Sequence, residues 1–306
     1  TRRILDFYSD HIGPYAYEKL AHVQATTVNG GMELASAIFY GYRGQPGRQL
    51  IAHEMAHQWF GDSVTERDWD DVWLSEGFAT YFALLFEEHV DGRDAFLAGV
   101  SSSARSAVTF ALANPTSTLV HQNLADISRV IANNAQVYQG GGQVLHMLRG
   151  VMGDARFWAG IRLYYGRHHT GYASSRDLQR AMEDACRSEG GCPERLADLG
   201  WFFDQWLHRG GILQLRGGWR YDETTHQLLV DLEQVQPGAP YLMPIDVAFT
   251  ATDGAATQAR GGTATVWLSA GDRRASVAIP MPAAPATVSL DPERKVTLMQ
   301  AQFAAR

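Results

Sequence analysis

Hydrophobic positions divide the chain into two stretches with different periods. Up to about residue 210, apolar residues recur every three or four positions, which is the spacing of a helix with one buried face. Val144, Leu145, Leu148, Val151 and Met152 give the clearest example. This spacing predicts helices at residues 4–12, 49–60, 76–89, 94–112, 143–152, 154–169, 174–188 and 194–208.

The first 210 residues also contain a small amount of predicted sheet. Residues 20–28 and 37–42 have the composition of short strands, and the glycine pair Gly30-Gly31 lies between them. Glycine pairs are typical of turns because glycine adopts backbone conformations that other residues avoid. We therefore expect two strands joined around a turn within a mainly helical domain.

After residue 210 the pattern changes to strict alternation. Apolar residues then occupy every second position, in runs separated by clusters of Gly, Pro and Asp. The runs are 228–232, 245–249, 266–268, 277–279 and 288–290. Several short alternating strands of this kind predict a β-sandwich. The fold class is therefore α+β, with a mostly helical domain at 1–210 and an all-β domain at 211–306.

Composition places the chain among ordinary globular proteins. It has 306 residues, of which 45% are hydrophobic and 19% charged, and this length allows two domains with separate cores. The net charge of −7 argues against a nucleic-acid surface, which needs clustered Lys and Arg. No apolar run approaches the roughly 18–20 residues of a membrane helix. We therefore expect a soluble protein with no nucleic-acid partner and no membrane span.

The two cysteines leave the cellular compartment open. Cys186 and Cys192 lie in a short polar segment and could form a disulfide, which would favour an oxidising compartment. They could equally be two separate thiols, because the sequence does not supply the Cα separation that decides between these cases. The expected location is cytoplasmic or extracytoplasmic, and a disulfide would favour the second.

Residues 50–62, LIAHEMAHQWFGD, carry the candidate chemistry. On a helix, His53 and His57 lie one turn apart on the same face, so both imidazoles can reach one metal ion. Glu54 is rotated by about 100° from His53, within reach of a water molecule on that metal. A catalytic zinc takes three protein ligands and leaves a fourth position for water. Glu76, in WLSEGFATYF, is the candidate third ligand because it opens the next predicted helix.

Two other interpretations of this segment were weighed. The histidines could lie on a surface helix and contact only solvent. The metal could also be structural, although structural zinc sites favour four protein ligands rich in Cys, and neither cysteine is near this segment. The pattern favours one Zn²⁺ held by His53, His57 and Glu76.

The chain resembles a known family in three ordered segments. Residues 53–82, HEMAHQWFGDSVTERDWDDVWLSEGFATYF, resemble the metal-binding segment of the aminopeptidase N and leukotriene hydrolase family of gluzincin zinc peptidases. GGMEL, at 30–34, is similar to the GAMEN exopeptidase signature of that family. VYQGGGQVLHML, at 137–148, is similar to its tyrosine motif. The resemblance spans essentially the whole chain and implies a thermolysin-like catalytic domain, lacking its start, followed by the β-sandwich.

The resemblance also implies roles for single residues. Glu54 would be the general base acting on a zinc-activated water, and Tyr138 would donate a hydrogen bond to the oxyanion that forms during hydrolysis. Glu33 would bind the free α-ammonium group of a peptide. The remaining members of the substrate-binding segment would be Gly30, Gly31 and Met32. The implied activity is hydrolysis of the N-terminal peptide bond of peptides.

Two positions depart from the family pattern. Leu34 stands where the family has Asn, which removes a polar contact near the substrate and could shift selectivity. Gly140 stands where the family usually has Lys, and this change could loosen the segment that carries Tyr138. We interpret the glycine run that begins at Gly140 as a flexible entry to the next helix.

Other functions remain open at this stage. Glu33 argues against a gluzincin endopeptidase, and a bifunctional epoxide hydrolase is known in one branch of the family. A noncatalytic, metal-retaining peptide-binding or scaffold fragment is the alternative from a different class. Family members carry a further N-terminal region, and this chain begins inside a helical pattern. That region of the same protein is therefore an expected partner, beside peptide substrates with a free amino terminus.

Overall fold

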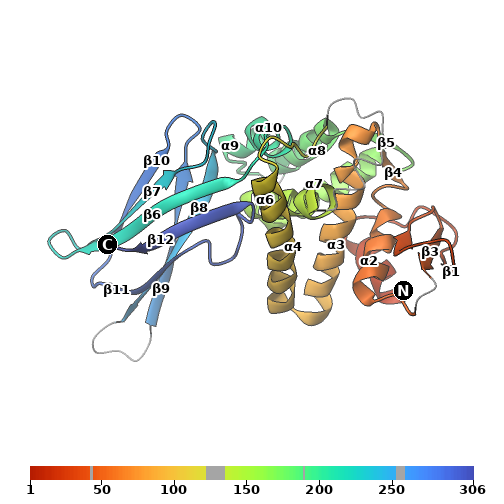
Figure 1. The fold of residues 1–306 in the computed structure, drawn as a ribbon, viewed down its shortest axis with the longest axis horizontal. Helices are drawn as coiled ribbons and strands as arrows, with labels where there is room; N and C mark the ends of the chain where they lie inside the picture. The colour runs from red at the N-terminus through yellow and green to blue at the C-terminus, as the bar shows by residue number, and fades with distance from the viewer. Residues whose placement is uncertain (42–43, 122–134, 189, 253–258) are drawn as a thin grey trace. The chain divides into compact units, whose positions relative to one another are not determined.

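The computed structural model describes residues 1–41, 44–121, 135–188, 190–252 and 259–306. These residues form two compact units, Thr1–Gly211 and Ile212–Arg306. Figure 1 shows helices and short strands in the first unit and strands in the second. This composition confirms the predicted α+β class.

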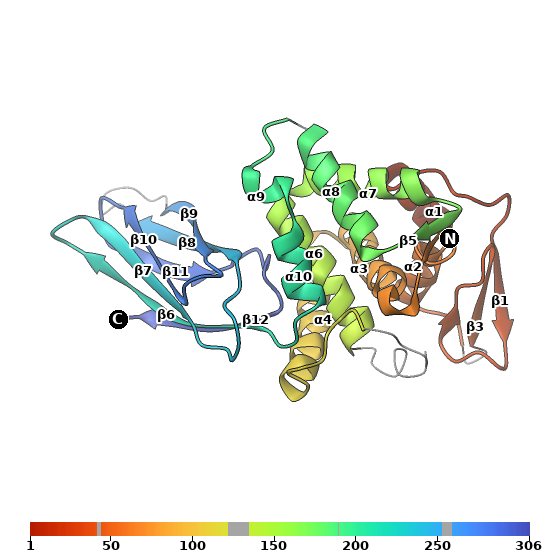
Figure 2. The same ribbon diagram turned by 90° about the horizontal axis from the view of Figure 1, so that it is seen from above.

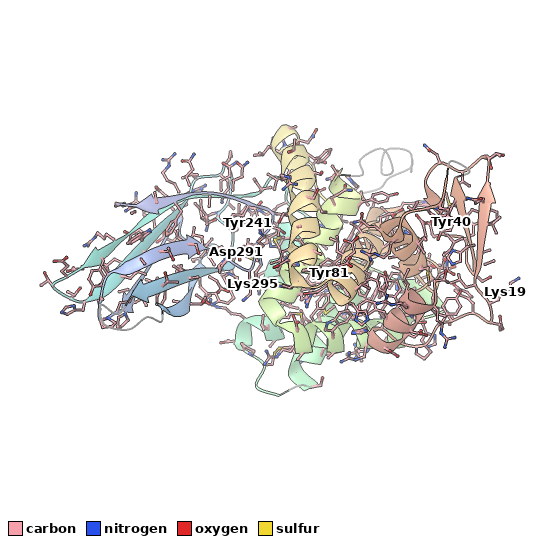
Figure 3. The ribbon with its side chains drawn as sticks, turned by 90° about the horizontal axis from the view of Figure 1, so that it is seen from below. Lys19, Tyr40, Tyr81, Tyr241, Asp291 and Lys295 are labelled. Atoms are coloured by element: carbon pink, nitrogen blue, oxygen red, sulfur yellow. A yellow bond between two sulfur atoms is a disulfide. The ribbon has the colours of Figure 1, made fainter. Side chains whose placement is uncertain are left out.

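Helices form most of the first unit. In chain order they are α1 (Arg2–His11), α2 (Arg48–His57), α3 (Trp73–Asp91), α4 (Arg93–Ala113), α6 (Gly141–Met152), α7 (Asp154–His168), α8 (Ser175–Ser188), α9 (Glu194–Ala197) and α10 (Gly200–Leu207). Helix α3 lies side by side with α2, and α7 with α8 (Figures 1 and 2). Most of α3 is buried, which agrees with its nearly continuous apolar sequence. Tyr81 of α3, labelled in Figure 3, contacts Nδ1 of His146 on α6 through its hydroxyl at 3.1 Å.

The strands of the first unit form two small sheets. The larger has the order β1 (Ala21–Ala25), β3 (Ala37–Gly41), β2 (Gly31–Met32), and β2 is antiparallel to β3. Gly30 closes the turn before β2 with φ of 84°, a conformation that favours glycine. The prediction that Gly31 belongs to this turn was wrong, because Gly31 opens the strand opposite Tyr40. Strands β4 (Val64–Glu66) and β5 (Gly171–Ala173) form a second, parallel pair that was not predicted.

Two helix predictions need correction. The helix expected at 194–208 is two helices, because Asp198 is extended and its carboxylate accepts a hydrogen bond from the Gly200 N–H at 2.8 Å. Such a bond from a side chain to the backbone competes with helical hydrogen bonding. The helix expected from residue 143 begins at Gly141 and follows a π-helical turn, Ala135–Gly140.

Gly141 lies in a close crossing of α6 with α3. A Cβ atom at Gly77 of α3 would lie 2.8 Å from the Cα of Gly141, and one at Gly141 would lie 3.0 Å from the Cα of Gly77. Glycine is therefore required at both positions for the two backbones to approach this closely. The prediction of a flexible entry at this glycine run was wrong, because the crossing fixes it inside the core.

The second unit consists of two sheets of alternating strands. One has the order β10 (Arg274–Pro280), β7 (Gln227–Gln234), β6 (Leu213–Asp222), β12 (Met299–Ala305), and the other β11 (Pro285–Leu290), β8 (Met243–Thr252), β9 (Ala259–Leu268). Alternate residues of β7 and β8 are buried, as the period of two predicts. Strands β6 and β12 were missed. Most side chains of β12 are exposed, and Gly217-Gly218 interrupts the alternation of apolar residues in the sequence of β6.

A short loop of the second unit is closed by a charged group. The backbone N–H groups of Lys295 and Val296 both donate to the Asp291 carboxylate at 2.8 Å. The Lys295 ammonium in turn pairs with Asp246 of β8 at 2.8 Å, and Figure 3 labels Asp291 and Lys295. These bonds hold the residues between β11 and β12 against β8.

Cys186 and Cys192 form a disulfide with a Cα separation of 5.2 Å. This separation lies within the range that a disulfide spans without backbone distortion. The bond ties the end of α8 to the segment before α9. Of the two states that the sequence left open, the paired one is found.

Helix α4 bears on the expected absence of a membrane span. It has 21 residues with a mean hydropathy of 1.2, which is long and apolar enough to cross a membrane by length and composition, and 22% of that window is buried. Phe96, Val100, Ala104 and Ala107 form its buried face. A single helix of this kind is weak evidence for a span, because core helices of globular proteins pass the same test.

The glycine crossing gives a test of the fold. Gly77→Ala should lower the free energy of unfolding by about 1–3 kcal/mol, because the added methyl group overpacks a backbone contact. Gly166→Ala on α7 is the matched control, since a Cβ there meets nothing within 4 Å. It should raise the free energy of unfolding by up to about 1 kcal/mol through helix propensity. Urea unfolding followed by circular dichroism measures both, and equal effects would contradict the crossing.

Candidate metal centre

Three side chains predicted to share a metal converge between α2 and α3. His53 and His57 lie on α2, and Glu76 lies in the first turn of α3. The Nε2 atoms of the two histidines are 3.1 Å apart, and Glu76 Oε2 is 3.3 Å from each of them. The three atoms therefore form a nearly equilateral triangle.

The size and chemistry of this triangle fit a divalent cation. Tetrahedral zinc bonds of about 2.0–2.1 Å to nitrogen and oxygen place neighbouring ligand atoms about 3.3–3.4 Å apart. Among the residues that the structure describes, none donates a hydrogen bond to the buried Glu76 Oε2, although a buried carboxylate oxygen normally has a partner. The alternative of histidines that contact only solvent is wrong, because the His57 side chain is 1% exposed.

The charges of the group support the same interpretation. Burial lowers the pKa of His53, and the facing Glu76 only partly opposes this effect. Burial also acts to lower the pKa of His57, but the Glu76 carboxylate outweighs it and raises that pKa to about 10. For Glu76, the two imidazoles outweigh burial and hold the pKa well below its usual range. The carboxylate therefore remains ionised.

His57 is oriented by atoms outside the triangle. Its Nδ1 lies 3.0 Å from the Ser75 hydroxyl and 3.2 Å from the Phe60 carbonyl oxygen. A hydrogen bond from Nδ1 leaves Nε2 free to bind a metal and fixes the plane of the ring. Ser75 was not predicted, because a serine beside a candidate ligand has no distinctive sequence pattern.

Glu54 is buried beside the triangle. Its carboxylate faces β2 so closely that a Cβ atom at Gly31 would lie 2.1 Å from Oε1. Burial raises the pKa of Glu54 to about 8, while nearby His57 opposes the shift. Gly31 therefore provides space for Glu54, a role that was not predicted for this member of the expected substrate-binding segment.

Glu33 brings a further carboxylate to the group. Ligand atoms of Glu33, Glu54 and His57 all lie within 4.8 Å of one another. On either side of Glu33, Met32 is 46% and Leu34 53% exposed. Gly30 lies before them in the turn that leads into β2. The segment predicted to bind substrate therefore has one acidic residue at the metal group and apolar side chains open to solvent.

Tyr138 reaches the group from the π-helical turn. Its ring is stacked on that of His53, with centroids 5.9 Å apart and an interplanar angle of 6°. Burial and a hydrogen bond to the adjacent Glu76 raise the pKa of the hydroxyl well above its usual value. Tyr138 therefore stays protonated and can donate a hydrogen bond. Isolated π-helical turns often occur at functional sites.

Two more acidic residues near the centre were not predicted. Burial raises the pKa of Asp62 and of Glu66 to about 7 in each case. His57 opposes the shift at both residues, and Glu33 adds to it. A metal group beside so many carboxyl groups attracts cations, including the ammonium group of a ligand.

A His-His-Glu group with a buried carboxyl group beside it is the ligand set of a hydrolytic metal centre. The chain belongs to peptidase family M1: residues 1–206 match the peptidase family M1 domain. This match confirms the family resemblance inferred from the motifs.

Relatives with stated functions share part of this chain. The human thyrotropin-releasing hormone-degrading ectoenzyme is 31% identical over 234 residues, which are 69% of this chain and 21% of that protein. Aminopeptidase N of Streptomyces lividans is 31% identical over 224 residues, which are 69% of this chain and 25% of that protein. The chain therefore spans about a fifth to a quarter of the length of these relatives.

A solved structure shares the fold. The crystal structure of Legionella pneumophila aminopeptidase A in complex with aspartic acid superposes with a TM-score of 0.77 at 15% identity. The match covers 99% of this chain and 34% of that protein. At this identity the likeness supports the fold and leaves the activity to be argued from the site.

The environment of His57 gives a test of the centre. Ser75→Ala should weaken Zn²⁺ binding by about 10-fold to 100-fold, because it removes an atom that orients the His57 ring. Ser101→Ala on α4, which removes a half-buried hydroxyl bonded to the Leu97 carbonyl, should leave the affinity unchanged. Titration against a competing chelator measures both dissociation constants. Equal affinities in the two variants would show that Ser75 has no such role.

Proposed function

We propose that this chain is the catalytic part of a zinc-dependent aminopeptidase that removes the N-terminal residue of peptides. In this proposal Thr1–Gly211 is the catalytic unit and Ile212–Arg306 an accessory β-sandwich. The observation that carries the proposal is the approach of the Glu33 carboxylate to within 4.8 Å of Glu54 and His57. Such a carboxylate can bind a free α-amine beside the reacting bond.

His53, His57 and Glu76 would hold one Zn²⁺. When bound, the ion would polarise the peptide carbonyl as a Lewis acid and lower the pKa of a water molecule in its fourth coordination position. The triangle of ligand atoms and the unpartnered Glu76 Oε2 support this assignment.

Glu54 would move the proton. A carboxyl group whose pKa lies near neutrality can accept a proton from the attacking water and return it to the leaving amine. Burial places the pKa of Glu54 at about 8 without a metal, and a bound cation would lower it toward the value of an efficient base. Its position against the β2 backbone keeps the carboxylate in one orientation.

Tyr138 and Glu33 would bind two polar groups of the substrate, the oxygen of the reacting amide and the neighbouring α-ammonium group. Tyr138 retains its proton and can donate to the oxygen on which negative charge develops. Glu33 would bind the α-ammonium and so restrict cleavage to the first peptide bond. The relatives named as aminopeptidases favour this exopeptidase assignment over an endopeptidase or an epoxide hydrolase.

A noncatalytic peptide-binding fragment is the second candidate, because the chain covers only part of its relatives. The expected ligand is the same, but a binding protein has no need for Glu54 or Tyr138. Turnover therefore separates the two functions, and binding alone does not.

Removal of the proton acceptor should separate chemistry from metal binding. Glu54→Gln should lower kcat on aminoacyl anilides by at least about 100-fold, because the amide cannot accept the proton. Its zinc content should stay equal to that of the wild type, since Glu54 is not a ligand in this assignment. Metal analysis and steady-state kinetics measure the two quantities. A wild type as inactive as this variant on a panel of free-amine substrates would favour the binding function.

The role of Glu33 predicts a dependence on the free amine. Alanine anilide should be cleaved, whereas N-acetylated alanine anilide should not be cleaved measurably, because acetylation removes the positive charge that Glu33 would bind. Glu33→Ala should lower kcat/KM for the free-amine substrate by about 10-fold to 100-fold. Comparable cleavage of blocked and free substrates by the wild type would indicate an endopeptidase.

A further inference from the structure

Gln58 joins the metal-binding helix to the segment that carries Glu33. It follows His57 directly and is the C-cap residue of α2. Its side chain is completely buried. The sequence motif gives it no ligand role, yet its amide is among the most fully bonded side chains near the centre.

Both ends of the Gln58 amide are hydrogen-bonded. Oε1 accepts from the Ser36 N–H at 2.8 Å and lies 3.2 Å from the Tyr15 hydroxyl. Nε2 donates to the Glu33 carbonyl oxygen at 3.2 Å and to Asp62 Oδ2 at 2.7 Å. The amide therefore binds the backbone of residues 33–36 through both its oxygen and its nitrogen.

The partners fix the orientation of the amide. A backbone N–H can only donate and a backbone carbonyl can only accept, so Oε1 must face Ser36 and Nε2 must face Glu33. Asp62 gives Nε2 a second acceptor and opposes a rotation of the amide. Gln58 therefore ties the end of α2 to the backbone at both Glu33 and Ser36.

Backbone hydrogen bonds from the Ala21 N–H to the Ser36 carbonyl oxygen and from the Ala37 N–H to the Leu34 carbonyl oxygen also hold this segment. The Gln58 bonds add its link to the end of α2. Ser36 has φ of 63°, a left-handed conformation that costs energy in a residue with a Cβ. Met32 and Leu34 are largely exposed, so packing of these side chains contributes little to the position of the segment. The loss of the Gln58 bonds would allow the backbone that carries Glu33 to relax.

We propose that Gln58 is a positioning residue that fixes the Glu33 carboxylate relative to the metal centre, and thereby sets the preference for ligands with a free α-amine. This inference rests on the proposed function of Glu33. Since Gln58 would act through Glu33 alone, its loss should reduce amine recognition and leave metal affinity intact.

Two hydroxamates that differ only in the α-amine provide the test. Alanine hydroxamate carries the amine, propionohydroxamate lacks it, and both bind a metal through the hydroxamate group. In the zinc-loaded chain, the dissociation constant of propionohydroxamate divided by that of alanine hydroxamate measures amine recognition without turnover. Gln58→Met keeps the length of the side chain and removes its hydrogen bonds. It should reduce this ratio by about tenfold or more, with the affinity for Zn²⁺ and for propionohydroxamate unchanged.

Gln234→Met is the matched control. Gln234 is also a buried glutamine whose amide binds the backbone of a loop. It donates to the Tyr241 carbonyl oxygen at 2.9 Å and accepts from the Tyr241 N–H at 2.7 Å. It lies in the second unit, so its loss should lower stability without changing the ratio. Asp62→Ala is a milder variant that removes one acceptor of the Gln58 amide, and it should reduce the ratio by less than Gln58→Met.

A double-mutant cycle with Glu33→Ala completes the test. In that background Gln58→Met should have no further effect on the ratio, because the group through which it acts is absent. An unchanged ratio in both Gln58→Met and Asp62→Ala would overturn the inference. So would a full effect of Gln58→Met on the ratio in the Glu33→Ala background. A wild type that does not distinguish the two hydroxamates would overturn the role of Glu33 itself, and the inference with it.

Discussion

The contact of one buried carboxylate with two imidazoles is the constraint around which the first unit is organised. Glu76 lies in a site where burial alone would favour its neutral form, and the histidines of α2 hold it ionised. An ion of this kind is stable in a protein interior only when it is paired and its oxygens are satisfied. The pairing links α2 to the start of α3, and it does so through Glu76 Oε2, which faces the Nε2 atoms of both histidines. The position of every other group at the centre is defined relative to these two helices.

Two close contacts, each of which requires glycine, bring the remaining groups to the centre. Gly141 lets α6 cross α3 at Gly77, and the π-helical turn before it carries Tyr138 to Glu76 and His53. Gly31 lets β2 lie against the Glu54 carboxylate. Both approaches bring a segment distant in the sequence to within reach of the α2–α3 pair. The departure from the family pattern at Gly140 therefore lies in a region that the adjacent helix crossing holds in place.

The sequence predicted those features that depend on local spacing or on a resemblance. The period of three to four, the change to alternation after residue 210 and the i, i+4 histidines are all local, and the α+β class and the family are confirmed. Features that depend on distant contacts were missed. Strand β4 pairs with β5, more than a hundred residues later, and three-residue strands show no recognisable alternation. Ser75 and Gln58 were missed because a serine or glutamine beside a ligand has no distinctive pattern, and only the folded chain shows what its side chain contacts.

The residue proposed to bind the amine and the residues proposed to bind the metal lie on different types of structure, and this difference matters for the proposed reaction. The proposed ligands are on two packed helices, which hold side chains firmly, whereas Glu33 follows a two-residue strand with exposed neighbours. An error of about an ångström in the position of a binding group can lower a rate by about 100-fold. An exopeptidase of this design therefore needs a connection between the two parts. The buried Gln58 amide supplies one, because it accepts from the Ser36 N–H and donates to the Glu33 carbonyl oxygen, and Gln58 caps the helix that carries both histidines. A helix that carries two proposed metal ligands and is bonded at its end to the Glu33 segment can keep both distances fixed together.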